Sequence, residues 1–192
     1  SASGAAVSGT SADSAENGIS IRFSNDGITA ADDSGLSIDG TSLTITAAGT
    51  YLLSGSCEDG SVKVQKGTTG VALVLDGLTL SSQTTAPLIC AKSTEVTIEA
   101  SAGTINMLSD TEANNDGSED SNTENAVIKC KDGSQVVLCG TGELILQANG
   151  KNGIKSGAST ETEGDASLTI RELTLTIDAP VNDAVNAESI LN

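Results

Sequence analysis

Short bursts of alternating apolar and polar residues run along most of the chain. Nearly all are 3–6 residues long and follow a period of two, which is the pattern of a half-buried β-strand. Gly, Asn and Asp separate them, as expected for turns, and no window carries a helical period. The pattern therefore predicts an all-β chain. The bursts occupy residues 19–23, 36–38, 43–46, 51–55, 61–64, 71–80, 87–90, 96–100, 104–108, 126–130, 135–140, 143–148, 153–156, 167–172 and 173–179.

The bursts recur in a fixed order of three. Self-similarity at a period of about 20–50 residues indicates a solenoid, and three short strands per period predict a three-sided parallel β-helix. Each turn would pair with the next at a spacing of about 4.8 Å. The matching positions are Val127 and Ile154 (27 residues apart), Ile154 and Val185 (31), Val136 and Leu168 (32), and Leu144 and Leu175 (31).

One phrase returns once per period, as "NAVIKC" (125–130), "NGIKSG" (152–157) and "DAVNAE" (183–188). We interpret it as one face of the coil, with a small residue at a tight corner and an Asn or Asp before it that bonds backbone or adopts left-handed geometry. The alternative fold is an up-and-down β-sandwich, for which "NGKNG" (149–153) would form a hairpin turn. The small corner residues are Ala86, Ala126, Gly153 and Ala184.

Amino-acid composition limits the number of domains, the make-up of the core and the classes of partner. The chain has 192 residues, which favours one domain, and it is 37% hydrophobic but only 1% aromatic. Phe23 and Tyr51 are the whole aromatic set, so the core must be built from Val, Ile, Leu and Ala. The net charge of −17 argues against nucleic acid and anionic membranes as partners, and is compatible with divalent cations. No stretch approaches the about 20 apolar residues of a membrane span.

Residues 1–18 are rich in Ser, Ala and Gly and predict a flexible segment before a β-helix domain over 19–192. Such a segment often follows the lipid-bearing Cys of a bacterial lipoprotein, so we expect an extracellular or cell-surface protein, with a lipid anchor upstream as a conjecture. The chain stops at "ESILN", where another strand would be expected. Either it is a fragment truncated at its C-terminal coil, or another copy covers that coil.

Several long stretches resemble a known family. Their order is similar to that of the carbohydrate-binding-domain proteins secreted by anaerobic bacteria, over roughly residues 28–192. The resemblance implies a right-handed, single-stranded parallel β-helix of the pectate-lyase-like superfold. It also implies binding of cellulose or acidic plant polysaccharide, calcium in the helix and no catalysis. The stretches are "LTITAAGTYLLSG" (43–55), "VALVLDGLTLSSQTTAPLICAKSTEVTIEASAGTINMLSD" (71–110), "ENAVIKCKDGSQVVLCGTGELILQANGKNGIKS" (124–156) and "LTLTIDAPVNDAVNAESILN" (173–192).

The acidic segment 109–125 interrupts the coil rhythm. Calcium prefers 6–8 oxygen ligands, and this loop offers many, although its spacing is not that of an EF-hand. A solvated loop is the alternative. Asp116, Glu119, Asp120 and Glu124 are the predicted calcium ligands.

Asn and Asp residues at the coil corners form a second candidate cation set. The favoured interpretation is a ladder that caps its own backbone. Its members are Asn125, Asn152, Asn182 and Asp183.

Among the four cysteines, Cys90 and Cys130 occupy the same place in "APLICAK" and "NAVIKCK". They should lie one coil apart, near enough either for a disulfide or for two reduced thiols packed in the core. A zinc site is not expected, because the chain has no His and no C-x-x-C.

The residue set disfavours an enzyme. His is absent, Arg22 and Arg171 are the only arginines, and no Asp pair lies in a strand, so we predict no catalytic residues. The shortage of aromatic rings disfavours stacking on cellulose, and the charge of −17 would repel a uronate-rich polysaccharide unless cations bridge the two. The sequence therefore predicts calcium-dependent binding of acidic glycans.

Two other functions stay open. The open ends of a β-helix expose unpaired strands, so the chain could self-associate end to end as a fibre or adhesin subunit. Ice binding through the pairs Thr44/Thr46 and Thr174/Thr176 ranks last, because such pairs do not recur coil after coil.

Overall fold

The computed structural model describes residues 18–117, 122–159, 166–187 and 190–191, and these residues contain strands and turns but no helix. Accordingly, none of the described residues belongs to a helix that could cross a membrane. The strands are β1 (Ile19–Ser24), β2 (Gly27–Ala30), β3 (Leu36–Asp39), β4 (Ser42–Ile45), β5 (Gly49–Cys57), β6 (Ser61–Val64), β7 (Val71–Ser81), β8 (Leu88–Cys90), β9 (Glu95–Ala100), β10 (Ile105–Ser109), β11 (Ala126–Cys130), β12 (Gln135–Gly140), β13 (Glu143–Gln147), β14 (Asn152–Lys155), β15 (Ser167–Ile170), β16 (Thr174–Asp178), β17 (Val185–Asn186) and β18 (Ile190–Leu191).

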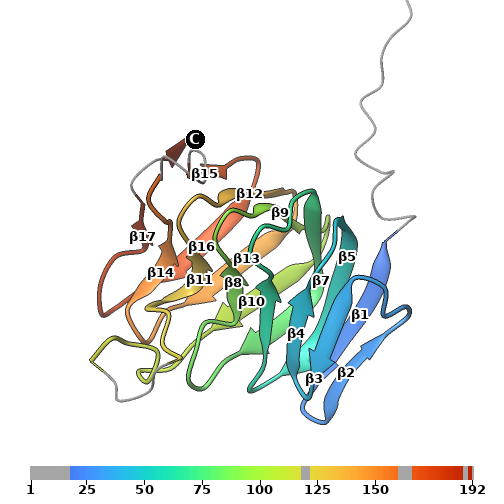
Figure 1. Ribbon diagram of the computed structural model, residues 1–192. Coiled ribbons are helices and arrows are strands. Elements are labelled where there is room, and N and C mark those ends of the chain that lie inside the picture. The colour runs from blue at the N-terminus through green and yellow to red at the C-terminus, as the bar shows by residue number, and fades with distance from the viewer. Residues whose placement is uncertain (1–17, 118–121, 160–165, 188–189, 192) are drawn as a thin grey trace, which may run out of the picture.

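Parallel pairing between successive turns of the chain builds three stacks of strands (Figure 1). One stack, here called sheet B, runs β4-β6-β8-β11-β14-β17, with β3 at its end. The second runs β7-β9-β12-β15-β18, and the third runs β7-β10-β13-β16. Strand β7 belongs to both of these stacks because it bends at Gly77, whose φ of 76° suits a residue without a side chain.

Each turn from β8 onward adds one strand to each stack, in the order sheet B, second stack, third stack. The predicted triplet and the predicted parallel stacking are therefore confirmed. Three of the four predicted equivalences are confirmed as well, since Ile154 pairs with Val185, and the Val136–Leu168 and Leu144–Leu175 pairs are in register.

The fourth equivalence is wrong by one residue. Ile154 pairs with Ile128 rather than Val127, and Ala126 pairs with Asn152 rather than Gly153. The cause is that "NAVIK" holds one more residue between its Asn and the inward-facing Ile than "NGIK" does. In a strand such a slip reverses which side chains face the core.

The N-terminal end departs from the predicted parallel coil. Strands β1 and β2 pair antiparallel, and so do β3 and β4, which places β2 and β3 at the outer edge of that end. The sandwich alternative is wrong for the rest of the chain, because the Asn149–Gly150 turn joins β13 and β14, which lie in different sheets. The right-handed winding that the family resemblance implies is not decided by these pairings and stays a prediction.

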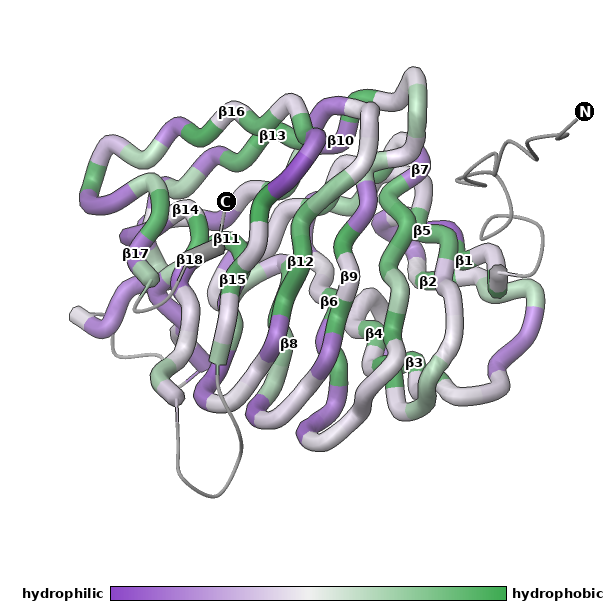
Figure 2. Tube along the Cα trace, turned by 90° about the horizontal axis from the view of Figure 1, so that it is seen from above, coloured by the Kyte–Doolittle hydropathy of each residue, from purple (hydrophilic) through white to green (hydrophobic). Residues whose placement is uncertain are grey.

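The core is a set of apolar ladders that run from turn to turn. Along most strands, hydrophobic and hydrophilic residues alternate, as Figure 2 shows for β13 and β16. Inward residues such as Leu88, Ile128 and Ile154 lie one above another and are fully buried. Stacking is what removes them from water, because one turn alone cannot bury its apolar side.

Candidate functional site

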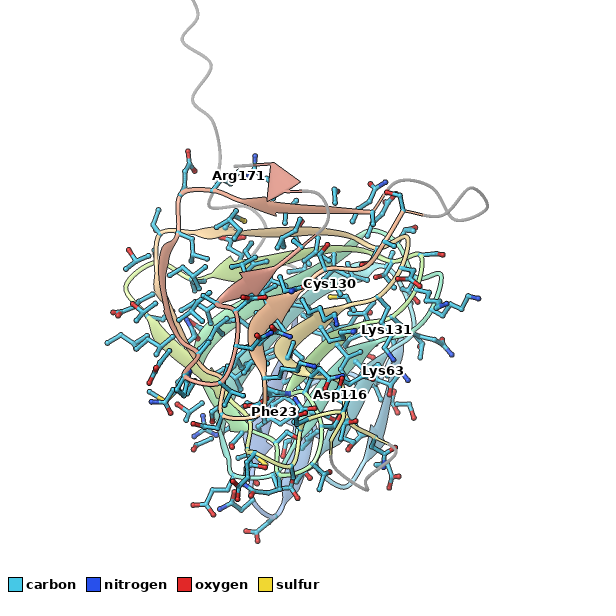
Figure 3. All side chains as sticks on the ribbon, turned by 90° about the vertical axis from the view of Figure 1, so that its left-hand side faces the viewer. Phe23, Lys63, Asp116, Cys130, Lys131 and Arg171 are labelled. Carbon is cyan, nitrogen blue, oxygen red and sulfur yellow. The ribbon has the colours of Figure 1, made fainter. Side chains whose placement is uncertain are left out.

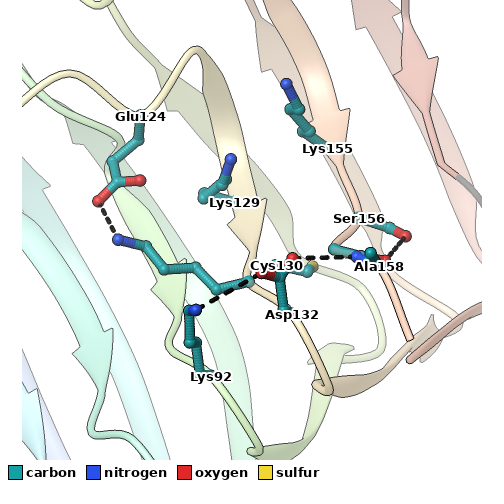
Figure 4. Close-up of a pocket in the computed structure, with 10 residues that line it drawn as sticks. Lys92, Glu124, Lys129, Cys130, Asp132, Lys155, Ser156 and Ala158 are labelled. Carbon is teal, nitrogen blue, oxygen red and sulfur yellow. Dashed lines mark hydrogen bonds and ion pairs between the residues drawn. The ribbon is translucent and has the colours of Figure 1, made fainter. Parts of the chain in front are cut away.

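A pocket of about 280 Å³ opens on the outer face of sheet B, beside β11 and β14 (Figure 4). Four of the nine basic residues in the chain line it, together with two acidic ones. A local excess of positive charge is unusual on a chain whose net charge is −17. The charged lining residues are Lys92, Lys129, Lys131, Lys155, Glu124 and Asp132.

Two of these lysines have carboxylate partners. Lys131 Nζ lies 2.7 Å from Glu124 Oε1, and Lys92 Nζ lies 3.5 Å from Asp132 Oδ2. The Asp132 carboxylate also accepts a hydrogen bond from the backbone N–H of Ala158, and this bond is the main reason that the pKa of Asp132 is lowered. Both acidic side chains in the lining are thus already engaged.

The other two lysines of the pocket are Lys129 and Lys155. They occupy directly paired positions on β11 and β14, so their side chains leave the same face one strand apart, at about 4.8 Å. Neither has an ion-pair partner among the residues that the structure describes. Figure 4 shows both amines extending to the same side, clear of the drawn hydrogen bonds and ion pairs.

The pKa of Lys129 is lowered, as expected for a half-buried lysine with little negative charge nearby. Burial lowers the pKa of Lys129, and the neighbouring charge of Lys155 lowers it further, with only partial compensation from Glu124. An anion placed between the two amines would remove their mutual repulsion and restore the charge balance of the pocket. The arrangement is therefore suited to a ligand that carries negative charge.

A buried polar cluster holds the neighbouring loop in place. The side chain of Asn114 accepts hydrogen bonds from the backbone N–H groups of Glu124 and Asn125, and it donates to Asp110 Oδ2 and the carbonyl of Ala126. The Asp110 carboxylate in turn accepts from the backbone N–H groups that follow β13. Burial is the largest influence on Asp110 and raises its pKa, against the opposing effect of these hydrogen bonds. The cluster sets the position of Glu124 beside Lys131.

The predicted calcium ligands are not brought together within the described part of the chain. Asp116 binds Lys151 Nζ through both carboxylate oxygens, at 3.1 and 2.9 Å, and Glu124 binds Lys131. Glu119 and Asp120 lie outside the described residues. Among the described residues no group of three or more His, Cys, Asp or Glu side chains converges on a point. A cation at Asp116 or Glu124 would have to displace a lysine, so these two residues do not fit a calcium site as they stand.

The corner asparagines form the predicted ladder. Asn152 donates from its side chain to the carbonyl of Asn125, and Asn182 donates to Asn152 Oδ1. Asn125 adopts a left-handed φ of 63°, as expected for a corner Asn. Asp183 bonds the side chain of Asn186 instead. Of these bonds, only the one from Asn152 to the Asn125 carbonyl caps backbone as we favoured; the bonds of Asn182 and Asp183 join side chains to each other.

Cys90 and Cys130 pair directly across sheet B, one coil apart as expected. Both are buried, and both thiols are free in this structure. A hydrogen bond to Cys130 and burial raise the pKa of Cys90 well above its ordinary value. A disulfide between them stays a prediction.

The repeated phrase contains a sequence signal for the lysine pocket. Lys129 and Lys155 each follow the inward Ile of the repeated phrase, in "VIKC" and "GIKS". Lys155 alone looks like an ordinary solvated lysine. Only the register between β11 and β14 shows that it has a second lysine beside it.

Stacked parallel strands, with a lysine-lined pocket on an otherwise acidic chain, define the class of this protein as an all-β protein of coiled parallel strands. Comparison with known proteins identifies the family of this chain. It belongs to the family described as carbohydrate-binding domain-containing proteins, whose family model matches residues 39–192. The resemblance found in the sequence is thereby confirmed.

A curated relative supports the assignment, and a solved structure shares the fold. A carbohydrate-binding domain-containing protein of Acetivibrio thermocellus is 33% identical over 145 residues, which are 75% of this chain and 50% of the relative. The chain thus spans about half the length of that curated relative. A solved structure from C. thermocellum, described as a polysaccharide lyase-like protein in a gadolinium derivative, superposes with a TM-score of 0.55. It is 23% identical, with 91% of this chain and 96% of the other covered, and this likeness concerns the fold alone.

Proposed function

We propose that this chain is a non-catalytic polysaccharide-binding module that recognises acidic, uronate-rich glycans through the lysine pocket on sheet B. Membership of the carbohydrate-binding domain family supports a polysaccharide ligand. The single observation that carries the choice of an acidic one is the pair Lys129 and Lys155, side by side without a carboxylate partner among the described residues. An extracellular or cell-surface location accords with such a ligand.

The pocket favours binding over catalysis. Apart from the buried thiol of Cys130, its titratable groups are lysines and two carboxylates that are each paired with a lysine, and the chain contains no His. Proton transfer needs a group whose pKa lies near the working pH and that reaches the reacting atom. Glu124 and Asp132 are each paired with a lysine, so neither carboxylate is left free to act as an acid or base.

The lysines of the pocket also explain how a chain with a net charge of −17 can bind an acidic glycan. A chain of −17 repels a polyuronate at long range, but the repulsion between exposed charges is screened beyond about 8 Å at physiological ionic strength. At shorter range the glycan meets the local positive charge of the pocket. Neutral glycans such as cellulose gain no charge attraction from these lysines, and Phe23 and Tyr51, the only aromatic residues, are buried and unavailable for stacking.

The test replaces each lysine by Met, which keeps the apolar stem and removes the charge. Binding to polygalacturonate is measured by isothermal titration calorimetry for wild type, Lys129→Met, Lys155→Met and the double variant. Each single variant should weaken binding by about fivefold to tenfold, as for the loss of a charge contact of about 1–1.4 kcal/mol. Arg171→Ala is the matched control, because it removes one positive charge at an exposed position after β15, on another sheet.

The outcomes separate the alternatives. Neutral dextran should not bind, and dextran sulfate that bound as tightly as polygalacturonate would contradict the preference for uronate. Polygalacturonate affinity that survived in the double variant would place recognition elsewhere on the chain. Release of unsaturated or shortened sugars during the titration would show catalysis and contradict the non-catalytic role.

Calcium dependence is a separate part of the proposal, and no step of the lysine mechanism passes through calcium. We predict that EDTA weakens polygalacturonate binding and that excess calcium restores it. Unchanged affinity in EDTA would remove calcium from the function and leave the lysine pocket intact. End-to-end self-association also stays a prediction, and light scattering across a concentration series distinguishes it from a monomeric module.

A further inference from the structure

We infer that the acidic glycan lies across the strands of sheet B, along a straight line of outward positions, so that the site engages several consecutive sugars of one chain. This inference rests on the proposed function and adds the direction, length and mode of binding. Its basis is the register of the strands together with the charge of the side chains that the register aligns.

The line is set by five consecutive register pairs. Each member pairs directly with the next, from β4 through to β17, and each alternates with inward core residues on its own strand. The six positions along it are Thr44, Lys63, Ile89, Lys129, Lys155 and Asn186.

The composition of this line differs from that of the chain. It holds three lysines and no carboxylate, although the chain carries 26 acidic residues and only nine basic ones. The outward position between Lys63 and Lys129 is Ile89, which is only 6% exposed and places no charge between them. The six aligned positions therefore place no negative charge of their own along the path of a linear anion.

Because parallel strands are evenly spaced, the register fixes the distances between the lysines of the line. Lys129 and Lys155 are one strand apart, at about 4.8 Å, and Lys63 is two strands further from Lys129, at about 10 Å. Figure 3 shows Lys63 and Lys131 on the same side of the molecule and Arg171 at the top of the view, away from them. A ligand that reaches all three lysines of the line must extend about 15 Å, which a single sugar cannot do.

A linear polyuronate fits this requirement, because its carboxylates repeat along the chain. The pair Lys129 and Lys155 would hold one stretch of it, and Lys63 would engage the same chain further along. Binding of this kind is multivalent within one ligand, so affinity should increase with ligand length until the line is filled.

The experiment titrates galacturonate oligomers of increasing length, from the monosaccharide upward, into the full chain by calorimetry. Affinity should increase with length and level off once the oligomer spans about 15 Å. Lys63→Met should weaken binding of the long oligomers by about fivefold and leave the shortest binding ligand unchanged. Lys155→Met should weaken both. Arg171→Ala should alter neither.

The results distinguish failure of the extended binding mode from failure of the lysine pocket. Affinity that does not depend on length, or long-oligomer binding that Lys63→Met leaves unchanged, overturns the extended mode while the lysine pocket stands. Absence of binding to oligomers of every length overturns the pocket and the extended mode together. Thermal unfolding of each variant, compared with wild type, shows that the fold is kept.

Discussion

The substitution Asn114→Asp tests the polar cluster that holds the loop beside the pocket. Asn114 is fully buried, and its side-chain nitrogen donates to Asp110 Oδ2 at 2.8 Å and to the carbonyl of Ala126 at 3.0 Å. An aspartate of the same shape turns this donor into an acceptor. It leaves the Ala126 carbonyl without its partner and brings a second carboxyl group against Asp110.

The magnitude follows from two costs. An unsatisfied buried carbonyl costs about 1–3 kcal/mol. Two carboxylates in contact cannot both ionise, so the folded variant retains one proton between them. Keeping that proton at pH 7 costs about 4 kcal/mol, since an ordinary Asp has a pKa of about 3.9 and each pH unit costs about 1.36 kcal/mol. We expect the variant to lose about 5–7 kcal/mol at pH 7.

The pH dependence identifies the mechanism. The folded variant binds one more proton than the unfolded chain, so its stability decreases as pH rises and recovers by about 1.36 kcal/mol per unit on acidification towards pH 4. Asp110 already has a raised pKa in the wild type, which gives the wild type a dependence of the same sign. The difference between variant and wild type is therefore the quantity to follow, by urea unfolding at several pH values.

Two further variants serve as a compensating double substitution and as a control. Asp110→Asn combined with Asn114→Asp restores one amide opposite one carboxylate, and it should recover the pH-dependent part of the loss while the Ala126 carbonyl stays unpaired. Asn182→Asp is the exposed control and should cost less than about 1 kcal/mol. A loss below about 1 kcal/mol at pH 7 for Asn114→Asp, or a loss equal at pH 5 and pH 7, would refute the hydrogen-bond assignment.

Three other predictions concern the bend, the thiols and the pocket. Asn106→Ala should lower the free energy of unfolding by about 2–4 kcal/mol in urea, because the buried side chain accepts from two backbone N–H groups at the β7 bend; a neutral effect would contradict this. With a thiol reagent at pH 8, Cys139 should react in the native protein, whereas the buried Cys90 and Cys130 should react only after unfolding; prompt labelling of all would show that the core opens. Because burial and Lys155 lower the pKa of Lys129, polygalacturonate binding should weaken with rising pH before an ordinary lysine would lose its proton, and Lys129→Met should abolish that early phase.

Local alternation was sufficient to locate most of the strands. The bursts at 61–64 and 126–130 coincide with β6 and β11, because a strand that buries one face must alternate regardless of its partners. Strand β2 was not predicted, since "GITA" is short and shows little alternation. Its antiparallel pairing with β1 depends on the turn between them, which the repeat pattern of the later coils does not describe.

The candidate site was harder to predict because its residues come from different turns. Lys129 and Lys155 lie 26 residues apart, and the predicted alignment was off by one on β11. The acidic loop carries many carboxylates, yet Asp116 is paired with Lys151, which is distant in sequence, and Glu124 is paired with Lys131 at the other end of β11. Composition reports which charges a segment carries, but it does not report which partners the fold brings to them.

By itself, the sequence determined that this chain is built of short strands in a repeating order of three, because periodicity and turn residues are local properties of the chain. It also determined the family, through the order of those phrases. Only the tertiary structure decided which lysines stand next to each other and which carboxylates are already occupied. Those facts depend on strand register, where a shift of one residue moves a side chain from the core to the surface, and register is set by the packing of all the turns together.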